Sequence, residues 1–270
     1  MATKKAAPSV KKSTAKKPTK TTKSTKSTTV KAVATSKPLV LFRSPLKGMP
    51  HIATLIAEFI GTFLFAGAVI AGQGQPIIIL FALAGIVMLV GTLSGAHLNP
   101  AITIGAFVTR KITGLRAIGY IVAQFLGALT ALGALNAFIG GAATPTAGYA
   151  SATLYQAAAI PAGKEWYIFF AEVLGTAILG FAIATVIRHK ADRVASAFTA
   201  GLGIFVALLL AASAAAYVGG TAIINPAVAL SLNALKWELW PLAAYVLAPI
   251  IGAVVGFIVQ DILQVETDKA

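Results

Sequence analysis

The segments SGAHLNPA, residues 94–101, and NPAVAL, residues 225–230, decide how this chain folds. Each contains Asn-Pro-Ala within an apolar stretch that is too short to cross a bilayer. Asn is a preferred N-cap of a helix, and Pro at the next position has a φ angle suited to the first helical turn. The two segments therefore predict two short half-helices, near residues 100–109 and 226–235.

Both segments belong to a larger internal repeat. The motif Glu-x-x-Gly-Thr occurs upstream of each Asn-Pro-Ala, beginning at Glu58 in the first half and at Glu172 in the second. The repeat halves, about residues 52–138 and 166–261, each hold three long apolar segments. Because three is odd, the second half must cross a membrane in the opposite sense, which makes an inverted repeat with the functional site near the midplane.

The composition indicates lipid as the solvent of this chain. Hydrophobic residues make up 57% and charged residues 11% of the 270 positions, whereas a soluble domain is about a quarter charged. Each apolar segment can cross a hydrocarbon layer about 30 Å thick as a helix. We expect an all-α membrane protein with two re-entrant half-helices and six transmembrane helices, near residues 52–72, 76–94, 115–138, 166–187, 195–216 and 239–261.

The positive charge is concentrated before the first apolar segment. Residues 1–57 hold 13 Lys and Arg residues and no acidic residue. We predict a disordered Lys-rich tail at residues 1–47, a membrane-embedded domain at 48–262 and a short tail at 263–270. In a six-span model, the loops that carry most of the other Lys and Arg residues lie on the same side of the membrane as the tail. The positive-inside rule therefore places both termini in the cytoplasm. We expect the protein in the plasma membrane.

The basic tail has two candidate binding partners. Lys residues attract anionic lipid head groups, and they also neutralise nucleic-acid phosphates. Residues 1–41 contain no aromatic side chain that could stack on a base, which favours lipid.

The two half-helices are expected to meet N-terminus to N-terminus, because they enter from opposite faces. Each N-terminus carries roughly half a positive charge, so their meeting point repels cations. The side-chain amides of Asn99 and Asn225 are expected to stay free to donate hydrogen bonds to a solute in single file. This arrangement favours neutral hydrogen-bonding molecules over protons and metal ions. The motif residues are Asn99, Pro100, Ala101, Asn225, Pro226 and Ala227.

On these duplicated motifs, residues 52–262 resemble the aquaporin (major intrinsic protein) family. The resemblance implies a right-handed bundle of six helices, a pore through each protomer and a homotetramer. It also implies that Glu58 and Glu172 hold the re-entrant loops by accepting backbone hydrogen bonds; direct contact of these carboxylates with solute is the alternative. His97 is implied to be a packed loop residue, with a pH gate as the alternative.

The chain departs from the family at the outer constriction. Most members carry Arg three positions after the second motif's Asn, and here that position is Val228. When the family's constriction positions are transferred to this sequence without gaps, they fall on Ile79, Ser213, Ala222 and Val228. Such a constriction has one hydroxyl group and no charge, so we expect a wider and more apolar pore than in water-selective members.

The function that follows is a passive channel for water and small uncharged solutes of the glycerol, urea and ammonia class. A poorly selective ion- or proton-permeable pore is one alternative, because an Arg is missing. A non-conducting membrane anchor for the basic tail is another. We predict no enzyme activity, because the chain shows no nucleotide-binding glycine loop and no catalytic constellation. No cofactor or metal site is expected either, since the chain has no Cys and only three scattered His residues.

Overall fold

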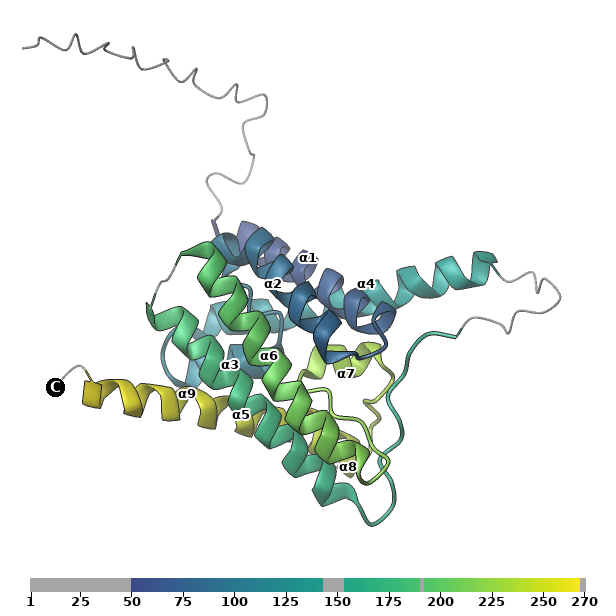
Figure 1. Cartoon of the computed structure of the whole chain (residues 1–270). Helices are drawn as coiled ribbons and strands as arrows, with labels where there is room; N and C mark the ends of the chain where they lie inside the picture. The colour runs from purple at the N-terminus through teal and green to yellow at the C-terminus, as the bar shows by residue number, and fades with distance from the viewer. Residues whose placement is uncertain (1–49, 143–152, 190–191, 268–270) are drawn as a thin grey trace, which may run out of the picture. The chain divides into compact units, whose positions relative to one another are not determined.

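The computed structural model describes residues 50–142, 153–189 and 192–267, and within these ranges every regular element is helical (Figure 1). The Lys-rich tail predicted at residues 1–47 lies outside the described residues. The expected all-α architecture is confirmed for the part of the chain that the structure describes.

Six helical segments of the described chain are long and apolar enough to cross a membrane. Five are single helices, and the sixth is a continuous run of three elements, which we call the last span. The single helices are α1 (Pro50–Ala71), α2 (Pro76–Ser94), α4 (Gly114–Ala142), α5 (Glu165–His189) and α6 (Arg193–Ala216); the last span consists of α8 (Leu239–Leu242), η2 (Ala243–Leu247) and α9 (Ala248–Thr267).

The helices extend beyond the apolar segments that predict them. Helix α4 continues to Ala142, where the prediction ends at 138, and α9 continues to Thr267, where the prediction ends at 261. Hydropathy marks where lipid contact ends, whereas a helix can run on into water as long as its backbone hydrogen bonds are made. The π-helical turn η2, in which the Ala248 N–H bonds to the Ala243 carbonyl, was not predicted.

The two half-helices begin where the sequence places them, at α3 (Pro100–Val108) and α7 (Pro226–Ser231). Helix α7 is shorter than the predicted 226–235. It ends because Asn233 adopts a left-handed φ of 55°, and the Ala234 N–H then bonds back to the Ala229 carbonyl. Asn is one of the few residues that take this conformation readily at a helix end.

The two halves pack in the same pattern, as an inverted repeat requires. Helix α1 packs on α2 and α4, and its counterpart α5 packs on α6 and α9. Helices α2 and α6 join the halves. Each half-helix packs against the third spanning segment of the other half, α3 against α9 and α7 against α4. The half-helices are thereby enclosed in the protein, where an irregular loop at membrane depth can have its backbone satisfied.

Glycines let the paired helices approach closely. A Cβ atom on Gly127 of α4 would overlap the Phe59 carbonyl of α1, and a Cβ atom on Gly252 of α9 would overlap the Val173 carbonyl of α5. These are corresponding crossings of the two halves. Small residues at such crossings permit the backbone contact that holds membrane helices together.

Candidate functional site

Asn99 and Asn225 are the N-caps of the two half-helices. The Asn99 Oδ1 accepts a hydrogen bond of 2.9 Å from the Ala101 N–H. The Asn225 Oδ1 accepts from the N–H groups of Ala227 at 3.0 Å and Val228 at 3.3 Å. Each side-chain oxygen therefore satisfies the free donors of the first turn, and each amide nitrogen points away from its own helix.

The amide nitrogens bind the opposite loops to each other. Asn99 Nδ2 donates to the Ile224 carbonyl at 2.8 Å, and Asn225 Nδ2 donates to the Leu98 carbonyl at 2.9 Å. Both amides were expected to be free for a solute, and these two hydrogen bonds correct that expectation. Each amide carries two N–H groups, and the hydrogen bond to the opposite loop uses one of them.

The residue before each Asn adopts the same unusual conformation. Leu98 has φ 53° and Ile224 has φ 52°, in the left-handed region that costs a branched or bulky residue free energy. This conformation turns the carbonyl of each residue toward the Asn of the other loop. The reciprocal hydrogen bonds therefore depend on backbone strain that the surrounding packing must maintain.

The fully buried carboxylate of Glu58 anchors the first loop. Its Oε1 accepts from the Ser94 hydroxyl at 2.6 Å and the His97 N–H at 3.0 Å. Its Oε2 accepts from the Leu98 N–H at 2.8 Å and from Gln124 Nε2 at 2.7 Å. Four donors from the loop and from α4 thus converge on one side chain of α1.

Glu172 anchors the second loop with fewer partners. Its two oxygens accept from the N–H groups of Ile223 and Ile224, at 2.5 and 2.7 Å. The side chain is fully buried on α5. Like Glu58, it contacts loop backbone, and it is absent from the walls of the two cavities described below.

Two tyrosines that the sequence analysis did not select also hold the loops. The Tyr120 hydroxyl donates to the Ser94 carbonyl at 2.6 Å, and the Tyr245 hydroxyl donates to the Thr221 carbonyl at 3.1 Å. Tyr245 lies on the π-helical turn. The sequence does contain a pattern that could have identified them: a Tyr follows each motif at a similar distance, 21 residues after Asn99 and 20 after Asn225.

His97 is packed into the first loop. Its Nδ1 lies 3.2 Å from the Thr103 hydroxyl, and its ring meets the Tyr120 ring edge to face at 5.3 Å. The side chain is 7% exposed and forms part of the wall of the inner cavity. The geometry agrees with the packed loop residue that the resemblance implies.

A narrow inner cavity lies beside the two capping residues. It measures about 10 Å³, close to the smallest volume that holds one water molecule, about 10–15 Å³. Asn99 and Asn225 supply its polar wall together with His97. The other side chains around it are apolar: Phe65, Leu83, Ala96, Leu98, Ile102, Leu179, Ile183 and Ile204. A cavity of this volume is about large enough for one water molecule.

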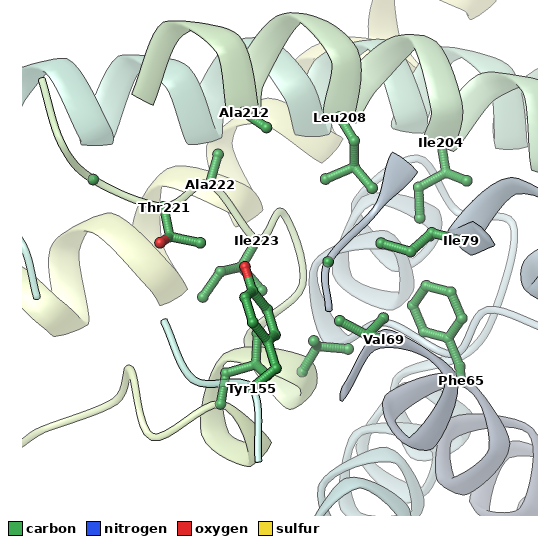
Figure 2. A pocket seen from close by; sticks show the side chains of 14 residues that line it. Phe65, Val69, Ile79, Tyr155, Ile204, Leu208, Ala212, Thr221, Ala222 and Ile223 are labelled. Carbon is green, nitrogen blue, oxygen red and sulfur yellow. The ribbon is translucent and has the colours of Figure 1, made fainter. Parts of the chain in front are cut away.

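A wider cavity of about 160 Å³ lies next to it (Figure 2). The two share Phe65 and Ile204 in their walls. We call the wider one the outer cavity. Three of the four predicted constriction residues line it, namely Ile79, Ala222 and Val228.

Ser213 does not line the outer cavity, although the transfer of the family's constriction positions without gaps predicted that it would. Its hydroxyl donates to the Leu209 carbonyl at 2.6 Å on the exposed face of α6. Ala212 takes the place in the wall (Figure 2). One residue along a helix is a rotation of about 100°, because a turn has 3.6 residues, so an alignment shift of one moves a side chain from the cavity to the outside.

The walls of both cavities lack Asp, Glu, Lys and Arg among the described residues. Within the same part of the chain, no group of three or more His, Asp or Glu residues could hold a metal ion. The sequence analysis missed Phe65, Ile204, Leu208 and Tyr155 as wall residues. The first three carry no pattern that separates a pore-lining apolar residue from a packed one.

Comparisons with known proteins agree on one family. The family model for the major intrinsic protein matches residues 45–260. Nodulin-26 from Glycine max is 32% identical over 237 residues, which cover 83% of this chain and 82% of that protein. The glycerol uptake facilitator protein-like 6 from Lactiplantibacillus plantarum is 33% identical over 215 residues, covering 74% and 93%.

A solved structure has the same fold. The aquaglyceroporin from Plasmodium falciparum superposes with a TM-score of 0.60 at 22% identity, over 82% of this chain and all of that one. Six apolar helices of spanning length and the matched family model together indicate an integral membrane protein. The chain belongs to the major intrinsic protein family and is a channel for water or small solutes, not an enzyme.

Proposed function

We propose that the chain is a passive channel for water and small uncharged solutes of the glycerol, urea and ammonia class. One observation carries this proposal. The N-termini of α3 and α7 are tied together by the Asn99 and Asn225 amides beside a cavity about large enough for one water molecule, and no charged side chain of the described chain lines this cavity or the outer one.

The selectivity against cations comes from the helix ends. Each half-helix N-terminus carries partial positive charge, and the two lie beside the narrow passage. The second N–H of each Asn amide donates to a passing molecule, which replaces part of the solute's hydration. These N–H groups replace part of the hydration of a neutral hydrogen-bonding solute, whereas a cation is repelled by the partial positive charge of the N–H groups at this point.

The solute range follows from Val228 in the wall of the outer cavity. Val228 stands where most family members carry Arg, so the outer constriction has neither its bulk nor its charge. A wider apolar constriction accommodates solutes larger than water. Two relatives, by name a glycerol uptake facilitator and an aquaglyceroporin, support this range.

Stopped-flow light scattering on proteoliposomes tests the proposal. Vesicles are shocked in turn with sucrose, glycerol and urea. Fast shrinkage in sucrose followed by fast reswelling in glycerol or urea is the expected result. Fast shrinkage with no reswelling would show a water channel, and the reading of the outer constriction would then be wrong.

An ion- or proton-permeable pore is the second candidate, and Val228 favours it. Without an Arg, the barrier to cations rests on the two helix ends alone, and α7 has only six residues. Voltage clamp of a planar bilayer that contains the protein decides the matter: a conductance no higher than that of the bare bilayer would eliminate this candidate.

Orientation, membrane and assembly are further parts of the proposal. Arg110, Lys111 and Arg116 follow α3, and Arg188 and Arg193 flank the loop between α5 and α6. The positive-inside rule makes these loops cytoplasmic, and with them both termini. We place the protein in the plasma membrane. Because channels of this family are usually tetramers, we propose a homotetramer with one pore in each protomer.

A further inference from the structure

One hydroxyl group of the outer cavity has no hydrogen-bond partner among the described residues. Among the side chains that line this cavity, only Tyr155 and Thr221 carry a polar group. The Thr221 hydroxyl accepts a hydrogen bond of 3.0 Å from the Ala158 N–H. The Tyr155 hydroxyl has no partner among the described residues, so it is available to a molecule in the cavity.

Tyr155 lies on a segment that is hydrogen-bonded to two residues of the cavity wall. The segment before α5 donates from Ala157 to the Leu232 carbonyl at 3.1 Å and from Ala158 to the Thr221 hydroxyl. Leu232 and Thr221 themselves line the cavity. Two hydrogen bonds within three residues of Tyr155 therefore set its position relative to the wall.

The phenol ring packs against the turn between α1 and α2. Gly74 has φ 70°, and a Cβ atom there would lie 2.7 Å from the Tyr155 hydroxyl oxygen, so only Gly leaves room for the ring. Figure 2 shows the ring extending toward the loop of Thr221 to Ile223, across the cavity from Ile79 and Phe65. The cavity thus has an apolar side at Ile79 and Phe65, and the Tyr155 ring lies across from it.

We infer that Tyr155 is a specificity-determining residue of this channel: its unpartnered hydroxyl is a hydrogen-bonding group of the outer cavity that selects small neutral solutes with a hydroxyl or amide group. This inference rests on the proposed function. A solute that enters an apolar passage gives up water, and each unpaired polar group raises the barrier. Tyr155 replaces one lost hydrogen bond.

The Tyr155 phenol can form hydrogen bonds with both the hydroxyl and the amide groups of a solute. Burial raises the pKa of Tyr155 above its ordinary value, so the hydroxyl is neutral at physiological pH. A neutral hydroxyl both donates and accepts, which serves the hydroxyl groups of a polyol and the N–H and carbonyl groups of urea alike. It also introduces no charge that would favour ions.

The test compares Tyr155→Phe with the unmodified protein and with Tyr217→Phe in proteoliposomes. Tyr217 is 90% exposed at the end of α6 and lines neither cavity, so it is a matched control for the same chemical change. Tyr155→Phe is expected to lower glycerol and urea permeability about two- to tenfold, the factor that corresponds to one net hydrogen bond. Water permeability is expected to change less, because neighbouring water molecules in the file can supply the lost partner.

The possible results separate the two proposals. Equal glycerol and urea permeability in Tyr155→Phe and Tyr217→Phe would overturn the role of Tyr155 and leave the neutral-solute channel standing. An equal loss of water, glycerol and urea permeability in Tyr155→Phe alone would assign Tyr155 a structural role and would overturn its role in specificity. An unmodified protein that passes neither glycerol nor urea would overturn the proposed solute range, and this inference with it.

Discussion

The close crossing of α1 and α4 at Gly127 makes a sharp test of the packing that supports the pore. A Cβ atom on Gly127 would overlap the Phe59 carbonyl oxygen and lie 3.0 Å from the Phe63 nitrogen. Both neighbours are helix backbone and cannot rotate away. Since non-bonded heavy atoms settle at about 3.5–4.0 Å, Gly127→Ala must push the two helices apart by about 1 Å.

The loss of stability expected for Gly127→Ala follows from the known effect of enlarging a side chain in a packed site. Inserting one methyl group into a packed site costs about 1–3 kcal/mol. For a chain of this size, each kcal/mol lowers the melting temperature by about 2–4 °C. Glu58 precedes Phe59 on α1, so the displacement also shifts the carboxylate that holds the first loop. We therefore expect Gly127→Ala to lower both thermal stability in detergent and solute permeability in vesicles.

Gly133 supplies the matched control on the same helix. A Cβ atom at Gly133 meets nothing within 4 Å, and Ala is favoured over Gly in a helix interior by up to about 1 kcal/mol. Gly133→Ala is expected to be neutral or slightly stabilising, measured by the same melting and vesicle assays. If Gly127→Ala and Gly133→Ala gave equal melting temperatures, the close crossing would not matter to stability, and the argument would be refuted.

Three further predictions concern the pore and the surface. Val228→Arg should reduce glycerol and urea permeability at least about tenfold and water permeability less, since it adds bulk and charge to the outer cavity; an equal effect on all solutes in the vesicle assay would contradict its placement there. Asn225→Asp should remove the hydrogen bond to the Leu98 carbonyl and place negative charge between the helix ends, so planar-bilayer recording should detect a cation conductance; an unchanged current would count against the electrostatic barrier. Lys111→Met should lower the free energy of unfolding by less than about 1 kcal/mol, because its ion pair with Asp261 is partly exposed; a change in melting temperature above about 4 °C would show a larger role.

The sequence predicted the spans and half-helix starts because their signals are local. A run of about 20 apolar residues has few alternatives in a bilayer. Pro100 and Pro226, each after an Asn, mark helix starts through the backbone geometry of two adjacent residues. The end of α7 was harder to predict, because it depends on one left-handed residue, Asn233, that the sequence alone does not distinguish from a helical one.

The wall of the pore was predicted only in part. Ile79, Ala222 and Val228 line the outer cavity as expected from spacing, whereas Ser213 lies on the outside of α6. Spacing cannot resolve a shift of one residue, and on a helix that shift rotates a side chain out of the wall. Tyr155 carried no signal, because it lies in a connecting segment without periodicity.

The sequence by itself determined the class of protein: its duplicated motifs, odd number of spans in each half and apolar composition specify an inverted repeat of membrane helices. Only the tertiary structure decided that the Asn99 and Asn225 amides bind each other's loops, that four donors converge on Glu58, and that Tyr155 reaches the outer cavity. The physical reason is distance along the chain. Asn99 and Ile224 are 125 residues apart, and a hydrogen bond between them exists only after both halves have packed together.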